Sequence, residues 1–359
     1  MITPWLEPFW NHCIQAFKQG RLPHALLISG CAGLGKLAFA QALAQHILCS
    51  AKEERACGQC QSCLWFQAGN HPDFSLVRPE EDKKQIGIAQ IRDLSEALTR
   101  TGYGSHQVVI IHPAEAMNRA SANALLKTLE EPNGQVILLL VCDHPASLLP
   151  TIRSRCQELR VQQPSTEIAL SWLTTELSEL AQQSDLAAKA ASSTTTSSRP
   201  SKKRAVQTPT EMPSPAELLA LADGLPLRAF RLAQTGEWQQ HNAISADFIR
   251  VLSGQMTILK AAELWSKQSP LAVLTILATL VQDMIRLMTG LSTAQIQHRH
   301  HAADLQRLVQ QCQLHQLWSF MREILLAKRR AMSTANPNVQ LLLESVLLSY
   351  FSNKQRAKL

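Results

Sequence analysis

The pattern of hydrophobic and polar positions changes character near residue 163. Before that point, short apolar runs alternate with segments in which apolar residues recur every three or four positions. The runs predict strands and the periodic segments predict helices. The predicted strands are Ala25–Ser29, Phe74–Arg78, Gln107–His112 and Gln135–Cys142. The predicted helices are Trp5–Lys18, Leu37–Leu48, Ile88–Thr99 and Ser121–Glu131. Strands separated by helices imply an α/β domain over residues 1–163, with a mostly parallel sheet covered on both faces.

After residue 163 only the helical period remains. Ile168–Leu180 and Pro215–Ala222 predict two helices, and longer amphipathic helices follow, ending with Val339–Phe351. We therefore expect a small helical domain over 164–237 and an all-α domain over 238–359. The segment 187–213 interrupts the small domain with a Ser/Thr run, three prolines and the basic trio Lys202-Lys203-Arg204. It has little to bury, which predicts a disordered insertion whose charges are solvated.

Composition and charge narrow the class of protein. The 359 residues carry a formal net charge of +7, which leans towards a polyanionic partner, although part of the excess lies in the basic trio of the insertion. No cationic segment followed by an apolar one stands after Met1, so no signal peptide is predicted. The apolar stretch Leu271–Met288 is interrupted by Gln282, Asp283 and Arg286, which indicates a buried helix rather than a membrane span. We expect a cytoplasmic protein with no membrane partner.

Four of the nine cysteines are clustered. Cys49, Cys57, Cys60 and Cys63 are spaced C-x₇-C-x₂-C-x₂-C, and the others are scattered singly. A tetrahedral Zn²⁺ takes four thiolates, and a C-x₂-C step lets two sulfurs reach one ion across a tight turn. The set leaves no open coordination position, so we predict a structural zinc ion bound by these four residues. The alternative is free thiols in a loop.

A glycine-rich loop follows the first predicted strand. Gly30, Gly33 and Gly35 precede Lys36 in the pattern G-x₄-G-K, and a helix is predicted to start next. In a P-loop, such glycines let backbone N–H groups close around phosphates that the lysine neutralises. Yet Leu37 stands where a Ser or Thr hydroxyl should hold Mg²⁺, and the strand ending at His112 lacks the acidic residues that complete a metal site. We expect no efficient hydrolysis. Whether the loop still binds ATP or is vestigial stays open.

Two further motifs lie towards the end of the α/β domain. Residues 123–132, with the sequence NALLKTLEEP, place Leu125, Leu126 and Leu129 on one helical face that should pack on the sheet. Ser154-Arg155-Cys156 follows the last predicted strand. Arg155 is either a surface arginine paired with a neighbouring carboxylate or an arginine finger, whose planar guanidinium can span the oxygens of a transferring phosphate.

Taken in order, these motifs resemble one family. A strand with G-x₄-G-K, four cysteines, the NALLKTLEEP helix and S-R-C form the layout of the bacterial clamp-loader ATPases of the AAA+ class. The resemblance is strongest over residues 20–160. In the helical remainder, Asn336 to Glu344 looks like the start of the last collar helix. Gly224-Leu225-Pro226-Leu227-Arg228 resembles the sensor-2 segment, with its arginine one place late.

The resemblance implies an AAA+ P-loop domain, a helical lid and a C-terminal collar that mediates oligomerisation. The motor subunits of the family, gamma and tau, are expected to carry a Ser or Thr at the place of Leu37 and an Asp-Glu pair at the place of His112-Pro113. The damaged metal site thus points to a member that hydrolyses no ATP itself but supplies Arg155 to the ATP site of a neighbouring gamma or tau subunit. The implied partners also include the delta subunit, the beta sliding clamp and, through the complex, primed DNA.

Two other functions stay open from the residues alone. One is a working gamma- or tau-type ATPase, against which the missing acidic pair argues. The other is a zinc-ribbon nucleic-acid-binding protein, which should present basic and aromatic side chains around its cysteines. Residues 49–66 offer Lys52, Arg55, Trp65 and Phe66 beside two glutamates. No polymerase active site is evident, so polymerase activity would belong to a holoenzyme and not to this chain.

Overall fold

The computed structural model describes residues 2–51, 54–81, 83–99, 102–131, 135–192, 213–332 and 338–356, with the backbone alone over 183–192 and 352–356. The chain divides into two compact units, residues 1–168 and 169–359. Within the second unit, the buried side chains fall into two separate hydrophobic clusters, one over residues 169–238 and one over 244–350. The three-domain division that we expected from the sequence stays a prediction.

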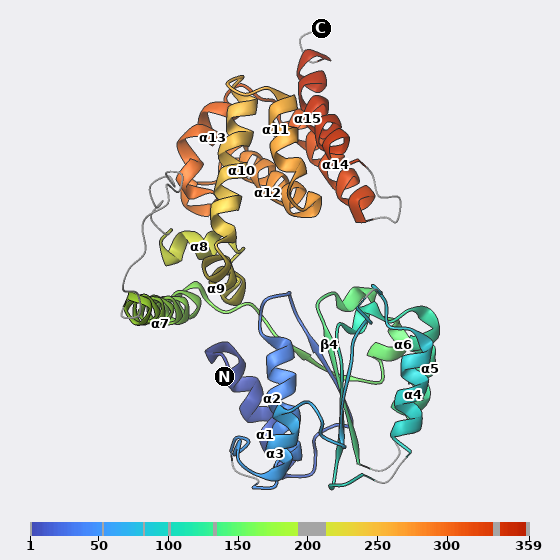
Figure 1. The fold of residues 1–359 in the computed structure, drawn as a ribbon. Coiled ribbons are helices and arrows are strands. Elements are labelled where there is room, and N and C mark those ends of the chain that lie inside the picture. Colours follow the sequence, from blue (N-terminus) through green and yellow to red (C-terminus); the bar gives the residue numbers. More distant parts are fainter. Residues whose placement is uncertain are drawn as a thin grey trace. The chain divides into compact units, whose positions relative to one another are not determined.

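The N-terminal unit is an α/β layer structure. Its strands are β1 (Ala25–Ser29), β2 (Phe74–Val77), β3 (Gln107–Ile111), β4 (Val136–Cys142) and β5 (Gln157–Arg160). They pair in parallel in the order β2-β3-β4-β1-β5. Its helices are α1 (Glu7–Lys18), α2 (Lys36–Leu48), α3 (Gln61–Gln67), α4 (Ile88–Ala97), α5 (Arg119–Glu130) and α6 (Pro150–Arg153), with 3₁₀ turns η1 (Pro4–Leu6), η2 (Ala114–Ala116) and η3 (Pro145–Ser147). Helices α1 and α2 cover one face of the sheet, and α4 and α5 cover the other (Figure 1).

The centre of the sheet is apolar because it is covered on both sides. Every residue of β1 and β4 is buried, as their unbroken apolar sequences predict for central parallel strands. Leu125 and Leu129 of α5 are buried in the cluster over β3 and β4, and Leu126 packs against its margin. The α/β fold predicted for this region is confirmed. Strand β5, which we did not predict, lies at the edge of the sheet and is mostly exposed.

The C-terminal unit is helical throughout its described residues. Its helices are α7 (Thr166–Ser192), α8 (Pro215–Leu221), α9 (Pro226–Thr235), α10 (Glu237–Leu252), α11 (Ile258–Ser266), α12 (Pro270–Met288), α13 (Ala302–Val309), α14 (Leu314–Met332) and α15 (Val339–Arg356), with 3₁₀ turns η4 (Thr293–Gln295) and η5 (Arg299–His301). Because α7 continues to Ser192, residues 187–192 are helical, and our prediction of disorder is wrong there. Most of the predicted insertion, including its basic trio, lies outside the described residues.

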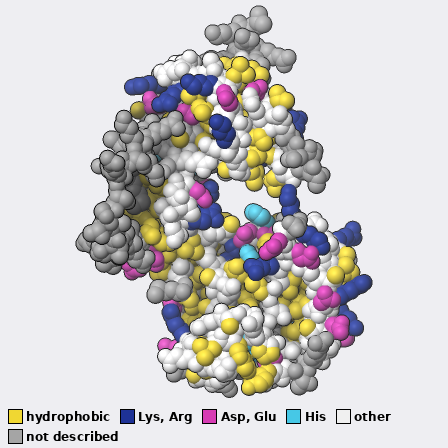
Figure 2. Space-filling view, in the orientation of Figure 1, with side chains coloured by type: hydrophobic (Ala, Val, Ile, Leu, Met, Phe, Trp, Pro, Cys, Tyr) yellow, Lys and Arg dark blue, Asp and Glu magenta, His cyan; other side chains and the backbone are white. Residues whose placement is uncertain are grey.

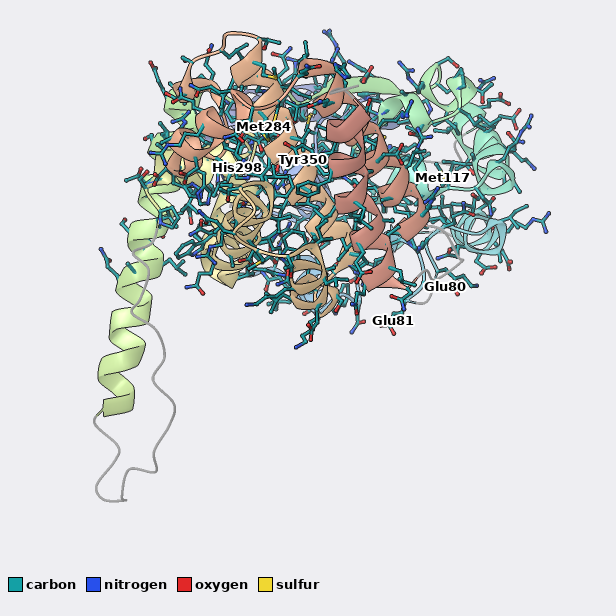
Figure 3. The ribbon with its side chains drawn as sticks, turned by 90° about the horizontal axis from the view of Figure 1, so that it is seen from above. Glu80, Glu81, Met117, Met284, His298 and Tyr350 are labelled. Atoms are coloured by element: carbon teal, nitrogen blue, oxygen red, sulfur yellow. The ribbon has the colours of Figure 1, made fainter. Side chains whose placement is uncertain are left out.

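Helix α12 is the central element of the larger helical cluster. By length and composition it alone, among the described helices, could cross a membrane. However, Val273, Leu277, Leu280 and Met284 along it are fully buried against neighbouring helices. Figure 3 shows Met284, Tyr350 and His298 among the packed helices of this unit. These contacts agree with the buried helix that we predicted for this stretch.

Candidate functional site

The glycine-rich loop has the backbone geometry of a P-loop. It leaves the carboxyl end of β1 and leads into α2, whose first residue is Lys36. Gly33 and Gly35 both have φ of +84°, a left-handed conformation that favours glycine. A Cβ on Gly30 would stand 2.4 Å from the carbonyl oxygen of Val161, so only glycine fits beside β5. The indole N–H of Trp5, which lies in η1, donates a hydrogen bond of 2.9 Å to the carbonyl oxygen of Leu34 and so holds the loop in place.

The lysine of this loop is engaged within its own chain. Nζ of Lys36 donates to the carbonyl oxygen of Cys31 at 2.6 Å and lies 2.6 Å from Oδ1 of Asp143. The Lys36 side chain is 3% exposed, whereas that of Asp143 is 26% exposed. A buried ammonium group needs a counter-charge, and Asp143 supplies it. Sequence reasoning placed Lys36 correctly at the head of a helix but did not identify Asp143, which is the first residue after β4.

A second carboxylate holds Asp143 in place. Oε1 of Glu115 accepts hydrogen bonds from the backbone N–H groups of Asp143 at 2.9 Å and His144 at 3.2 Å. Glu115 lies in η2, just after β3. Because β1, β4 and β3 are neighbours in a parallel sheet, Lys36, Asp143 and Glu115 converge on its carboxyl edge. Figure 2 shows basic, acidic and histidine side chains gathered on the N-terminal unit.

The metal-binding parts of an active ATPase are replaced at this edge. Strand β3 ends at Ile111, and His112 and Pro113 follow where acidic residues would be needed. Burial lowers the pKa of the His112 imidazole, and Lys36 lowers it further, while Asp143 and Glu115 act in the opposite direction. Neither the neutral imidazole of His112 nor Leu37, which has no hydroxyl, offers Mg²⁺ an anionic ligand, and the nearby carboxylates are engaged, Asp143 by Lys36 and Glu115 by backbone N–H groups. The site therefore lacks the hydroxyl after the P-loop lysine and the acidic pair after β3 that bind Mg²⁺ for phosphoryl transfer.

The four clustered cysteines converge on one point. Their Sγ atoms all lie within 4.8 Å of one another. The Cys49 Sγ is 3.6 Å from that of Cys57 and 3.9 Å from that of Cys60. Four sulfurs at about 2.3 Å from one Zn²⁺ in a tetrahedron lie roughly 3.8 Å apart, so the spacing fits zinc. The cluster could hold a metal ion, as the sequence pattern predicted.

Local structure prepares these thiols to act as ligands. Cys49 caps the end of α2 and Cys60 caps the start of α3, so the cluster joins two helices. Backbone N–H groups donate to sulfur at three places: Cys57 to Cys49 at 3.4 Å, Cys60 to Cys57 at 3.3 Å and Cys63 to Cys60 at 3.4 Å. Burial opposes ionisation of Cys60, but hydrogen bonds with the backbone of Ser50 and Cys63 and with the thiols of Cys63 and Cys57 bring the pKa of its thiol down to about 6. A thiolate stabilised in this way is suited to bind a cation, whereas burial and the neighbouring thiols raise the pKa of Cys63 to about 12.

Arg155 lies at the C-terminal end of α6, on the surface of the N-terminal unit. Its side chain is 36% exposed and pairs with the carboxylate of Glu130 at the end of α5. Nη1 also donates to the carbonyl oxygen of Thr151 at 3.1 Å. The pairing is the arrangement expected of a surface arginine, and the exposure leaves part of the guanidinium accessible. The finger role therefore stays a prediction. In the other unit, Arg228 lies in the first turn of α9, and its charge contributes to lowering the pKa of His241.

Fold and site together define a class. A parallel sheet in the order β2-β3-β4-β1-β5 with a P-loop after β1 is a P-loop fold of the AAA+ type, here without its metal-binding residues. The family model described as DNA polymerase III, delta subunit matches residues 5–165, and the model of that subunit's C-terminal part matches residues 235–350. The DNA polymerase III subunit delta' of Pseudomonas aeruginosa is 32% identical over 360 residues, covering 98% of each chain.

A second relative agrees. The DNA polymerase III subunit delta' of Escherichia coli strain K12 is 31% identical over 358 residues, covering 96% of this chain and 94% of the relative. The chain therefore belongs to the delta' family of DNA polymerase III subunits. Among solved structures, a gamma subunit-related protein of DNA polymerase III from Thermotoga maritima aligns with 95% of this chain and 99% of its own. The TM-score is 0.45 at 16% identity.

Proposed function

We propose that this protein is the non-hydrolysing AAA+ subunit of a DNA polymerase III clamp loader. In this role it helps to load the beta sliding clamp onto primed DNA during replication in the cytoplasm. Membership of the delta' family supports the assignment to the complex. The observation that carries the non-hydrolysing part is the neutralisation of Lys36 by Asp143 at an edge where Leu37, His112 and Pro113 stand in place of the Mg²⁺-binding hydroxyl and acidic pair. Polymerase activity would belong to the assembled holoenzyme.

The proposed partners are gamma or tau ATPase subunits on one side and the delta subunit on the other. Through them the protein acts on the clamp and on primed DNA. The all-α part of the chain is the proposed oligomerisation collar. Several large apolar side chains on its last two long helices are exposed: Trp318, Leu325, Met332, Leu341 and Leu348. Exposed apolar side chains of this size are suited to packing against helices of other subunits.

Zn²⁺ is the proposed metal, with a structural role. Cys49, Cys57, Cys60 and Cys63 would hold it as four thiolates, and no open position would remain for a substrate. The ion would fix the loop between α2 and α3. Its free energy of binding would add to the stability of the N-terminal unit, because the ligands converge only in the folded chain.

Arg155 is the proposed contribution to catalysis by a neighbouring subunit. A planar guanidinium offers five N–H donors, and here two partners, Glu130 and Thr151, engage it from within the chain. The pair with Glu130 is exposed, and such pairs are worth about 0–1 kcal/mol, so a triphosphate could take over the guanidinium at little cost. Glu130 would then hold Arg155 in place until a partner's ATP site comes within reach.

The experiment that tests the proposal is reconstitution. The full chain is mixed with purified gamma-type and delta-type subunits, and the product is resolved by gel filtration. Clamp loading is then measured on primed circular DNA with ATP. We expect a complex containing all three subunits and loading that requires this chain, with the mixture lacking it as the control. If the chain elutes alone, or if loading is equal without it, the proposal is wrong.

A further inference from the structure

The contact between Lys36 and Asp143 indicates a role for Asp143 that the P-loop motif does not reveal. We propose that the carboxylate of Asp143 is an internal ligand of the P-loop, standing where a nucleotide phosphate would otherwise neutralise Lys36. The positive charge of Lys36 in the phosphate-binding loop is thereby neutralised by a residue of the same chain. This inference concerns the isolated chain and does not rest on the proposed role in clamp loading.

The first support is the chemistry of the contact. Carboxylate and phosphate oxygens are both anionic acceptors, and both form short charge-assisted hydrogen bonds with an ammonium group. The distance of 2.6 Å between Nζ of Lys36 and Oδ1 of Asp143 is of that kind. The same Nζ donates to the carbonyl of Cys31, within the loop itself. The lysine side chain that would bind phosphate in a P-loop is therefore already bound to two oxygen atoms of its own chain.

The second support is burial. The Lys36 side chain is 97% removed from solvent, since 3% of it is exposed. An unpaired charge at such a depth is strongly unfavourable. A nucleotide competing for Lys36 must displace Asp143, and the displaced carboxylate would then lie beside the incoming phosphates. Like charges repel, so Asp143 both occupies the lysine and opposes its replacement.

The third support is that a separate residue positions Asp143. Oε1 of Glu115 accepts from the N–H groups of Asp143 and His144, which fixes the turn after β4. Within the described residues, Glu115 forms neither a hydrogen bond nor an ion pair with Lys36. It acts through the turn, and it adds a further negative charge at the edge where phosphates would come. Two carboxylates, one from the segment after β3 and one from the turn after β4, thus oppose the binding of anions at the loop.

The test measures triphosphate binding by the full chain. Isothermal titration calorimetry with ATP, and separately with inorganic tripolyphosphate, is carried out on the unaltered protein and on Asp143→Asn. We expect Asp143→Asn to bind both at least tenfold more tightly than the unaltered protein, because the competitor has lost its charge. Glu115→Ala should give a smaller gain by loosening the turn. Inorganic tripolyphosphate separates recognition of phosphate from recognition of the base.

Two controls show where the gain arises. Lys36→Met added to Asp143→Asn should abolish the gain, since the ammonium is then gone. Glu158→Gln removes a carboxylate from the neighbouring strand β5, where Glu158 accepts from Ser29 Oγ at 2.6 Å, and should leave triphosphate binding unchanged. Asp143→Asn that binds triphosphate no better than the unaltered protein would overturn the proposal. So would a gain that survives the loss of Lys36.

A second measurement covers the case in which Asp143→Asn does not fold. Thermal unfolding is compared for Lys36→Met, Asp143→Leu and the double variant. Asp143→Leu leaves the buried ammonium group of Lys36 without its partner, and Lys36→Met leaves the partly exposed carboxylate of Asp143 without its own, whereas the double change leaves neither. The double variant should therefore unfold at a higher temperature than either single variant. Additive losses, with no coupling between the two positions, would contradict an internal ligand.

Discussion

The hydroxyl of Ser62 lies 2.8 Å from Nε2 of His71, and it donates to the carbonyl oxygen of Leu48 at 2.6 Å. The backbone N–H of Asp73 donates to Nδ1 of His71 at 3.0 Å, so Nε2 carries the proton and donates to Ser62. Asp73 in turn accepts from the N–H groups of Tyr103 and Gly104. This chain of bonds ties the cysteine cluster to the segment that leads into β2.

Ser62→Ala should lower the stability of the N-terminal unit by about 1–3 kcal/mol, because it leaves the buried His71 without an acceptor. Urea unfolding at neutral pH measures the loss. Ser178→Ala is the control, because Ser178 is exposed on α7 and bonds only within its own helix. Equal effects of the two changes would show that the chain of bonds adds nothing.

The purified protein should contain about one zinc ion per chain, since the four thiols converge at zinc spacing. Cys60→Ser should reduce the zinc content well below one and lower the unfolding temperature. Elemental analysis with thermal unfolding checks both. Cys31→Ser, at an exposed cysteine outside the cluster, is the matched control and should keep its zinc. Unaltered protein with well under one zinc per chain would refute the metal site.

The isolated chain should show negligible ATP turnover, because Leu37, His112 and Pro113 replace the magnesium-binding hydroxyl and acidic pair, while Asp143 is paired with Lys36 and Glu115 with backbone N–H groups. Leu37→Thr should not restore turnover, since a hydroxyl alone does not supply the acidic residues missing after β3. A coupled assay for ADP release checks this. Steady turnover that Lys36→Ala abolishes would show that the site is catalytic after all.

Arg155→Ala should leave folding and assembly intact but depress DNA-stimulated ATP hydrolysis and clamp loading by the reconstituted complex. Loss of a finger costs about 10³–10⁵ in rate at one site. The defect of the whole complex should be much smaller, because other ATP sites keep their own arginines. Arg155→Lys should rescue poorly, since an ammonium group makes no bidentate contact.

Arg153→Ala is the control for this prediction, at the last residue of α6 and two residues before Arg155, and should matter less. A merely structural Arg155, paired with Glu130, predicts near-normal ATPase activity once gel filtration confirms assembly. That outcome would remove the finger assignment and leave membership of the family untouched.

Stability should fall as the pH drops from about 6.5 towards 4, in part because of His241 and His301. Burial, followed by the charges of neighbouring histidines, lowers the pKa of His241 to about 3 and that of His301 to about 4. In the unfolded chain both bind a proton near pH 6.5. The unfolded state then holds more protons within this window, so acid favours unfolding. Each group contributes at most about 1.4 kcal/mol per pH unit.

His241→Phe should flatten this dependence, because the ring still stacks on His298, 5.0 Å away between centroids, but takes up no proton. Urea unfolding from pH 7.5 to pH 4 measures the slope for the variant and the unaltered protein. Any loss of zinc at low pH is common to both and cancels in the difference. His12→Phe, at an exposed position, is the control. An unchanged slope in His241→Phe would contradict the assignment.

The hydrophobic pattern of the sequence predicts some elements of the fold and misses others. It predicts the bounds of β1 as they stand, because a central parallel strand is an unbroken apolar run. It misses β5, whose sequence Gln-Glu-Leu-Arg has no such run, because an edge strand is mostly exposed. It also misses α3, a short helix of seven residues whose N-cap is Cys60 of the cluster. This helix is stabilised by its N-cap and by the converging thiols rather than by an apolar face that the sequence pattern could predict.

The sequence by itself determined the local chemistry: the glycines and lysine of the P-loop, four cysteines at zinc spacing, and the missing ligands at Leu37 and His112. These are properties of short segments, and spacing along the chain is enough to find them. Only the tertiary structure decided what meets Lys36. Asp143 and Glu115 follow two other strands, β4 and β3, and a parallel sheet brings the carboxyl ends of its strands to one edge whatever their separation in sequence. No pattern within one segment records that meeting, because register and strand order arise from packing the whole core.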